Sequence, residues 1–205
     1  MTTEAEAALA RNARYLREFV EAFSLCPYAK RCRESGKLHR RVLLESAEAV
    51  SAIAEIEALP PAAVEVALLI FPRFDGGVRA FETFRGEVLE QMARAHAGQE
   101  PPFFCVAFHP ELPMDLADPH RAVHFTRRSP DPTLQLVRVS VLREIRGDRT
   151  GGSTFVDASR LTAAELMGLE APVSVSDRIA EANLESLRRA GPERLAAAFA
   201  SLRRG

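Results

Sequence analysis

A cysteine and a histidine, far apart in the sequence, are the residues whose types and surroundings best suit chemistry. Cys26 is followed by Pro27 and then by three cations, Lys30, Arg31 and Arg33. If the thiol lies near the start of a helix, the helix dipole and these cations lower its pKa and favour the thiolate. A thiolate attacks electrophiles and binds metals. The alternative is that the Cys-Pro pair only turns a corner around a buried thiol.

His109 is the second candidate, because it directly follows the apolar run 103–108, which is typical of a buried strand. It begins a Pro-containing segment that extends to Pro132, and loops held by a strand often carry reactive side chains. An imidazole titrates near neutral pH, so His109 is a candidate general base toward Cys26 or toward a substrate. In the alternative interpretation His109 hydrogen-bonds a loop carbonyl and stabilises the turn.

Arginines at the end of this segment suggest an anion site. Arg127 and Arg128 stand just before Ser129, and Arg138 follows nine residues later in a segment that we expect to be helical. Guanidinium groups bind carboxylates and phosphates bidentately, and the free amides at a helix start add to such a site. The predicted partner is therefore an anionic small molecule. For each arginine alone, a surface ion pair is the alternative.

The spacings of histidine and cysteine do not predict a metal site. His109, His120 and His124 match no standard motif, and Cys26 and Cys32 are too far apart for a common zinc hairpin without a second pair of cysteines. A Cys-Pro pair can also present a thiolate to haem iron, so haem is an alternative cofactor. Nothing in the sequence requires one.

The composition predicts one globular domain over residues 1–205. Hydrophobic residues make up 47% of the chain and charged residues 27%, and the formal net charge is -1. A balance of this kind lacks the positive field of a nucleic-acid-binding protein. No stretch approaches the roughly 20 apolar residues that cross a bilayer, and the N-terminus is charged, so we expect a cytoplasmic protein with no membrane partner.

Strands and helices alternate in the first half of the chain and must position these residues. The apolar spacings predict a helix over 4–24, a strand over 41–44, a helix over 48–59, a strand over 64–71, a helix over 81–97 and a strand over 103–108. This order predicts an α/β (or α+β) fold. Its small sheet is built from a βαβαβ unit with parallel neighbours, together with an N-terminal helix and a helical C-terminal part.

The second half is expected to be mostly helical. Residues 109–132 are expected to form a loop, so that His120 and His124 do not share a helical turn. The apolar residues at 134, 137, 141 and 145 fall on one face of a predicted helix. Further helices are expected over 161–169, 176–190 and the tail from 193. Cys105 is expected to be a core thiol.

Four motif blocks carry a resemblance to a known family. They are LCPYAK at 25–30, FHP at 108–110, RSP at 128–130 with Pro132, and NLESLRRAG at 183–191. In this order the chain resembles the bacterial family catalogued as domain of unknown function 1415 (DUF1415). The resemblance implies a small cytoplasmic bacterial protein of mixed helix and sheet, and it brings no established reaction. It singles out Cys26, His109, Arg128, Ser129, Arg138 and Asn183.

The chain departs from the family pattern at four positions. Arg127 stands where asparagine is expected, Asp131 where an aromatic residue is usual, Gln135 where the pattern tends to have histidine, and Val139 where it tends to have glutamate. If the histidine and the acid are catalytic in relatives, these departures imply a changed substrate or a lost activity.

Three functions follow from these observations. In the leading hypothesis Cys26 is the nucleophile of a small-molecule enzyme, His109 moves a proton, and Arg128 with Ser129, Arg138 and Asn183 holds the substrate. The second is a haem or metal protein with Cys26 or His109 as ligand. The third is a non-catalytic binding module whose motifs stabilise the fold.

Overall fold

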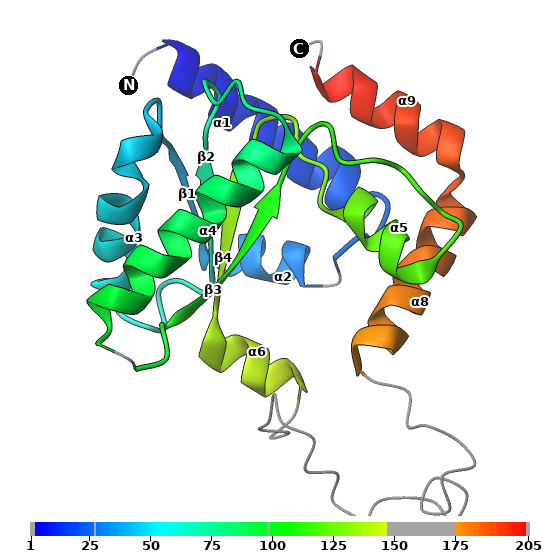
Figure 1. The fold of residues 1–205 in the computed structure, drawn as a ribbon. Coiled ribbons are helices and arrows are strands. Elements are labelled where there is room, and N and C mark those ends of the chain that lie inside the picture. Colours follow the sequence, from blue (N-terminus) through cyan, green and yellow to red (C-terminus); the bar gives the residue numbers. More distant parts are fainter. Residues whose placement is uncertain (1–2, 27, 98, 147–174, 204–205) are drawn as a thin grey trace, which may run out of the picture.

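The computed structural model describes residues 3–26, 28–97, 99–146 and 175–203, and a four-stranded sheet lies at its centre (Figure 1). Helices cover both faces of this sheet. The predicted mixed α/β fold is thereby confirmed. No helix among the described residues is long and apolar enough to cross a membrane.

The sheet has the strand order β1-β2-β4-β3. Its strands are β1 (Leu38–Val42), β2 (Val66–Ile70), β3 (Phe103–Phe108) and β4 (Thr133–Arg138). β1 and β2 are parallel, as predicted, whereas β4 is antiparallel to both β2 and β3. β2 and β3 therefore point the same way, as a βαβαβ unit requires, but β4 separates them. The expected strand at 41–44 begins three residues earlier than predicted.

The prediction of a helix from residue 134 was wrong over its first half. Only α6 (Val139–Arg146) is helical, and β4 precedes it directly. In β4, Leu134 and Leu136 are fully buried on one face while Gln135 between them lies on the other. This alternation of faces is the strand period, and pairing with a strand on each side outweighs the helical spacing of the same apolar residues.

The remaining predicted helices are present, apart from the one over 161–169, which lies outside the described residues. The predicted N-terminal helix ends in a π-helical turn, η1, and a short 3-10 turn, η2, precedes α3. The bounds are α1 (Thr3–Tyr15), η1 (Leu16–Glu21), α2 (Ala29–Glu34), η2 (Ser46–Glu48), α3 (Ala49–Glu57), α4 (Val78–Ala95), α8 (Val175–Ala190) and α9 (Pro192–Arg203).

The segment expected to be a loop contains a helix, α5 (Pro119–Thr126). The Asp118 side chain accepts hydrogen bonds from the backbone N–H groups of His120 and Arg121 at 2.9 and 3.2 Å. Asp118 is thus an N-cap, and Pro119 occupies the first turn, where its missing N–H does no harm. The Asp-Pro pair starts a helix here, and our prediction of a loop was wrong.

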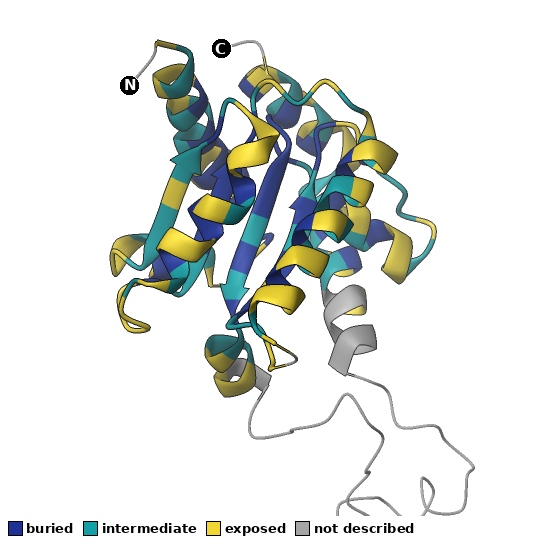
Figure 2. Cartoon of the chain, turned by 60° about the vertical axis from the view of Figure 1, so that its left-hand side comes forward, coloured by how far each residue is buried: buried dark blue, intermediate teal, exposed yellow. Residues whose placement is uncertain are grey.

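The two faces of the sheet belong to two separate apolar cores. Figure 2 shows that the strands are largely buried, whereas the outer sides of the helices are exposed. On one face, which we call the α4 face, the strands pack against α3 and α4. On the other, which we call the α1 face, they pack against α1, α5, α8 and α9. Phe19 of η1 joins the elements of the α1 face, because its ring lies 6.0 Å from Phe125 of α5 and 5.5 Å from Phe199 of α9. Cys105 is buried in the α4-face core, as expected.

Candidate functional site

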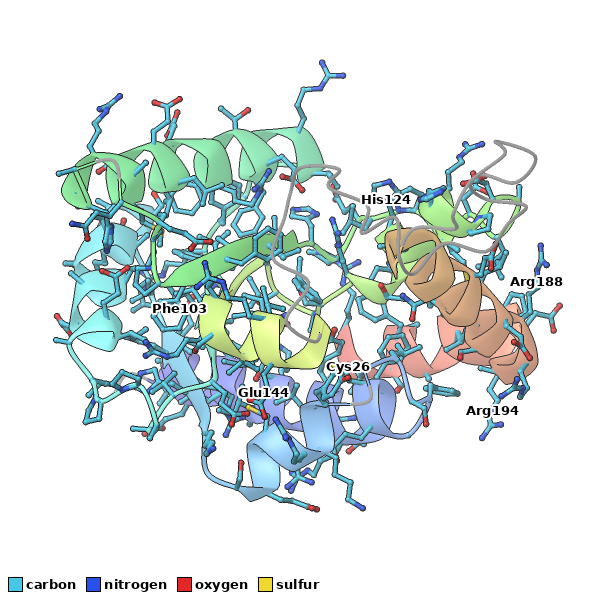
Figure 3. All side chains as sticks on the ribbon, turned by 90° about the horizontal axis from the view of Figure 1, so that it is seen from below. Cys26, Phe103, His124, Glu144, Arg188 and Arg194 are labelled. Atoms are coloured by element: carbon cyan, nitrogen blue, oxygen red, sulfur yellow. The ribbon has the colours of Figure 1, made fainter. Side chains whose placement is uncertain are left out.

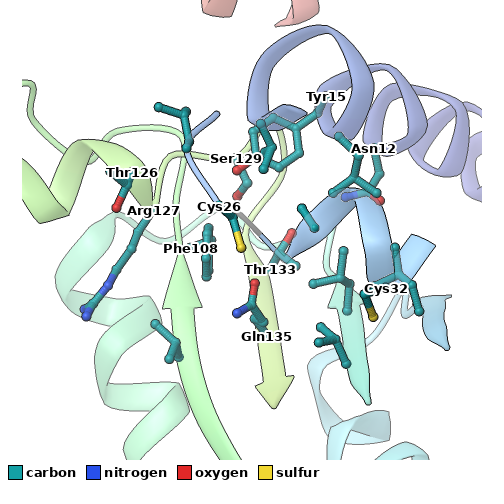
Figure 4. A pocket seen from close by; sticks show the side chains of 18 of the residues that line it. Asn12, Tyr15, Cys26, Cys32, Phe108, Thr126, Arg127, Ser129, Thr133 and Gln135 are labelled. Atoms are coloured by element: carbon teal, nitrogen blue, oxygen red, sulfur yellow. The ribbon is translucent and has the colours of Figure 1, made fainter. Parts of the chain in front are cut away.

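A cavity of about 240 Å³ lies on the α1 face, between the sheet and the N-terminal helices (Figure 4). Its floor comes from all four strands, and its roof comes from α1, η1 and α2. The floor residues are Leu38, Val66, Leu68, Val106, Phe108, Thr133 and Gln135. Because most of these side chains are apolar, the few polar groups among the lining residues determine what the cavity can recognise.

Cys26 borders this cavity, and its sulfur points toward the floor near Phe108 and Thr133 (Figure 4). Ser24 has a left-handed backbone with φ of 52°, which ends the helical turns and redirects the chain. Leu25 is then buried in the α1-face core, and Cys26 follows over the sheet with an exposed thiol. Figure 3 shows Cys26 on the same side of the sheet as α1 and α2.

Two of the three cations after Cys26 form ion pairs with carboxylates. Arg33 holds Glu21 through two hydrogen bonds of 2.7 and 2.9 Å, and Arg31 lies 3.2 Å from Glu65. The helix expected after Cys26 is present as α2, but it has only six residues. The positive surroundings predicted for the thiol are therefore largely compensated by neighbouring acids.

Asn12 and Tyr15 form part of the roof, and sequence reasoning missed both. The two residues are 3% and 4% exposed, and neither Asn12 Oδ1 nor the Tyr15 hydroxyl has a hydrogen-bond partner among the described residues. Burial raises the pKa of Tyr15, and a negative charge on Cys26 acts in the same direction, so the phenol stays protonated. Leaving such a group unpaired costs about 1–3 kcal/mol, which calls for an explanation.

Gln135 projects from the centre of the floor, and its amide makes no hydrogen bond to any described residue. The neighbouring hydroxyl groups are occupied. Ser129 and Thr133 both donate to the backbone oxygen of Asp131, at 2.6 and 2.8 Å. The Asp131 carboxylate is itself held by Arg11 at 2.7 Å. Three lining residues, Asn12, Tyr15 and Gln135, thus carry a polar group that makes no hydrogen bond to a described residue.

His109 lies on the opposite side of the sheet from the cavity. Phe108 lines the cavity, whereas the ring of the next residue, His109, lies 5.9 Å from that of Phe81 in the α4-face core. Its Nε2 is 3.1 Å from the Gly76 oxygen, and its Nδ1 accepts the Glu111 N–H at 3.2 Å. The structure does not bring His109 to Cys26, and the ring hydrogen-bonds a loop carbonyl, as the alternative interpretation has it.

Arg128 also lies outside the cavity. Its Nε donates to the Pro110 oxygen at 3.0 Å, and its guanidinium group stacks over the ring of Phe199 at 4.7 Å. Burial lowers the pKa of Arg128, with a smaller contribution from Arg203. This side chain connects the segment after β3 to α9, and its contacts are those of a residue that stabilises the fold.

Arg138 and Asn183 likewise lie outside the residues that line the cavity. Arg138 Nε donates to the Val64 oxygen at 2.8 Å, and its guanidinium group lies 4.5 Å from the Phe103 ring centroid, on the α4 face. Asn183 is half-buried on α8 and does not line the cavity. Of the six residues singled out from the sequence, only Cys26 and Ser129 line the cavity.

Comparison with known families supports the resemblance. A family model described as "Protein of unknown function (DUF1415)" matches residues 7–148, more than half of the chain. The chain belongs to the DUF1415 family. The match includes all four strands and every residue that lines the cavity, but it ends before α8 and Asn183. No curated protein and no solved structure matched the chain.

The four departures from the expected DUF1415 pattern fall in different surroundings. Gln135 is on the cavity floor, and Arg127 lines the cavity while its guanidinium group points away from Cys26 (Figure 4). Asp131 is paired with Arg11, and Val139 begins α6 outside the cavity. Gln135 is therefore the departure that bears most directly on Cys26. Among the described residues, no group of three or more His, Cys, Asp and Glu side chains is placed to hold a metal.

Proposed function

We propose that this protein is a small-molecule enzyme in which the Cys26 thiol attacks an electrophile bound in the cavity on the α1 face. The observation that carries the proposal is the combination of an exposed thiol with a roof that holds two buried, unpartnered polar groups, Asn12 and Tyr15. Unsatisfied buried groups are rare in folded proteins, and binding of a ligand removes their penalty.

The supported step is addition of the thiolate to a polarised carbonyl carbon. A sulfur–carbon bond forms, the π bond of the carbonyl breaks, and its electron pair moves to the oxygen. The Tyr15 hydroxyl, kept protonated by burial, donates a hydrogen bond to this oxygen. The thiol proton leaves to solvent, because Cys26 is exposed and the described lining residues include no imidazole or carboxylate.

This proposal keeps Cys26 from the leading hypothesis and replaces its partners. His109, Arg128 and Arg138 are engaged with backbone oxygens away from the cavity, so they support the fold rather than the reaction. The haem alternative gains no comparable support.

The test is acylation of Cys26 by p-nitrophenyl acetate, an activated ester with an electrophilic carbonyl. The folded protein should release a burst of p-nitrophenolate, with the acetyl group located on Cys26 by peptide mass spectrometry. The burst should be lost in Cys26→Ala and slowed about tenfold to a hundredfold in Tyr15→Phe, since one hydrogen-bond donor to an oxyanion has an effect of this order.

Two controls make the result specific. Cys105→Ala changes a thiol of the opposite core and should leave the burst intact. The same chain unfolded in urea reports the reactivity of Cys26 without a cavity, and folding should increase it. A folded Tyr15→Phe variant that reacts as fast as the parent protein, or a burst that survives in Cys26→Ala, would contradict the proposal.

A further inference from the structure

The cavity presents two side-chain amides from opposite sides. Asn12 reaches it from α1, and Gln135 reaches it from the centre of β4, with Cys26 beside them (Figure 4). Asn12 Oδ1 is a buried acceptor without a donor, and the Gln135 amide has no hydrogen bond to a described residue. Each amide offers both a donor and an acceptor, so together they complement a group that also carries both.

Arg127 is the one charged residue among the described residues that line the cavity. The described lining residues include no aspartate, glutamate, lysine or histidine, and the guanidinium group of the one arginine, Arg127, points away from Cys26. Arg127 lies instead within electrostatic reach of Glu82 and Arg85 of α4. A carboxylate or phosphate placed beside Asn12 would lose its hydration without meeting a counter-charge, which is strongly unfavourable.

We infer that the cavity binds a neutral carboxamide-bearing small molecule rather than an anion. Its amide N–H donates to Asn12 Oδ1, its carbonyl oxygen accepts from the Gln135 amide, and its apolar part packs against Val106 and Phe108. This inference rests on the proposed function for the location of the site, and it replaces the anionic partner expected from the arginines. The volume of about 240 Å³ lies below the usual range for drug-sized ligands, which limits the ligand to about one ring with its amide.

The experiment compares benzamide with benzoate, which have the same ring and differ in the neutral or charged end group. Binding is measured by protein-detected NMR titration of the full chain carrying Cys26→Ala. This variant cannot be acylated, so the result does not depend on the thiol chemistry. Benzamide should shift resonances of residues lining the cavity at millimolar concentration, and benzoate should bind at least about tenfold more weakly, a difference of about 1.4 kcal/mol.

Asn12→Leu and Gln135→Leu, each added to Cys26→Ala, test the two amides. Each should weaken benzamide binding about tenfold, because the ligand then loses one of its two hydrogen-bonding partners. Asn12→Leu should also raise the melting temperature, since it removes a buried acceptor that nothing satisfies. Gln91→Leu on the exposed surface of α4 is the matched control and should change neither binding nor the resonances of the cavity.

The outcomes separate this inference from the proposed function. No shift with benzamide would overturn the carboxamide site even if Cys26 is acylated normally. Benzamide binding that is as tight in Asn12→Leu and in Gln135→Leu as in Cys26→Ala alone would overturn it as well. Tighter binding of benzoate than of benzamide, lost in Arg127→Gln, would establish an anion site instead. Benzamide binding that requires both amides supports the inference even if p-nitrophenyl acetate gives no burst.

Discussion

The polar side chains on the two faces of the sheet differ in whether they have hydrogen-bond partners. On the α4 face, both ring nitrogens of His109 are engaged, and Arg138 is bound to a backbone oxygen and stacked on an aromatic ring. On the α1 face, Asn12, Tyr15 and Gln135 surround a cavity and have no partner among the described residues. Satisfied polar groups specify a fold, whereas unsatisfied ones in a cavity indicate a ligand.

Within the described part of the chain, the α4 face also has two buried atoms without a hydrogen bond, Arg138 Nη2 and Glu57 Oε1. These belong to groups of opposite charge that act on each other, and His96 Nε2 lies 3.5 Å from the Glu57 carboxylate. Burial raises the pKa of Glu57, while His96 and Arg138 oppose this rise. The orphaned groups of the α4 face thus compensate one another, which the neutral groups of the cavity do not.

The largest expected difference between the two faces is in the effect of substituting neighbouring residues of β4. Leu134→Ala on the α4 face should lower the free energy of unfolding by about 2–5 kcal/mol, because a fully buried side chain is lost and a void remains. Gln135→Leu, one residue later, should leave the free energy of unfolding unchanged or raise it slightly. Urea denaturation of both variants measures the difference. Equal losses would mean that the two faces are packed alike.

His109 gives the next largest effect. His109→Ala should lower the free energy of unfolding by about 2 kcal/mol, because two hydrogen bonds and the contact with Phe81 are lost. Acylation of Cys26 in the folded fraction should stay within about twofold of the parent protein. A loss of acylation as large as that in Cys26→Ala, with the fold retained, would contradict the assignment of His109 to the fold and would indicate a role in the reaction.

The Cys105 thiol provides a smaller, pH-dependent effect on the α4 face. Burial raises its pKa from 9.0 to about 12, so the folded protein keeps a proton that the unfolded chain releases. Stability should therefore fall as the pH rises above about 9, by about 1 kcal/mol near pH 10 from this thiol alone. Cys105→Ala should flatten the dependence of the urea midpoint on pH between about pH 8 and about pH 10.

Cys32→Ala is the control for this slope, that is, for the decrease of stability with rising pH. Burial, together with Glu65, raises the pKa of Cys32 to about 11, so this thiol contributes its own share from the cavity side. The Cys32→Ala protein should retain the part of the slope that belongs to Cys105. A pH dependence that is the same with and without Cys105 would show that its thiol ionises equally in both states.

The sequence predicted those strands and helices that a continuous apolar run or a regular amphipathic spacing marks. The apolar run at 103–108 coincides with β3, and the amphipathic spacings locate α1, α3, α4 and α8 to within a few residues. β4 was missed because its apolar residues fit a helical spacing as well as an alternating one. Only pairing with β2 and β3, which the local sequence does not contain, selects the strand.

Of the residues that line the cavity, the sequence had singled out Cys26 and Ser129 for the candidate site. Cys26 was found by its residue type, but His109 was assigned to the same site although one step along a strand reverses the direction of a side chain. Phe108 lines the cavity, so His109 cannot point the same way. Asn12 and Tyr15 were missed, although they lie three residues apart within the buried stripe of α1, between Ala8 and Phe19. A polar residue inside an apolar stripe was the available signal.

The position of β4 also has a consequence for synthesis on the ribosome. β4 is the last strand among the described residues but lies between β2 and β3, and its pairing of Val137 with Val66 joins residues 71 positions apart (137 − 66). A nascent chain that ends before β4 holds one parallel pair and a solitary strand, each with an open edge. Because such long-range pairing is slow, we expect the sheet to form late, after residue 138 has left the exit tunnel.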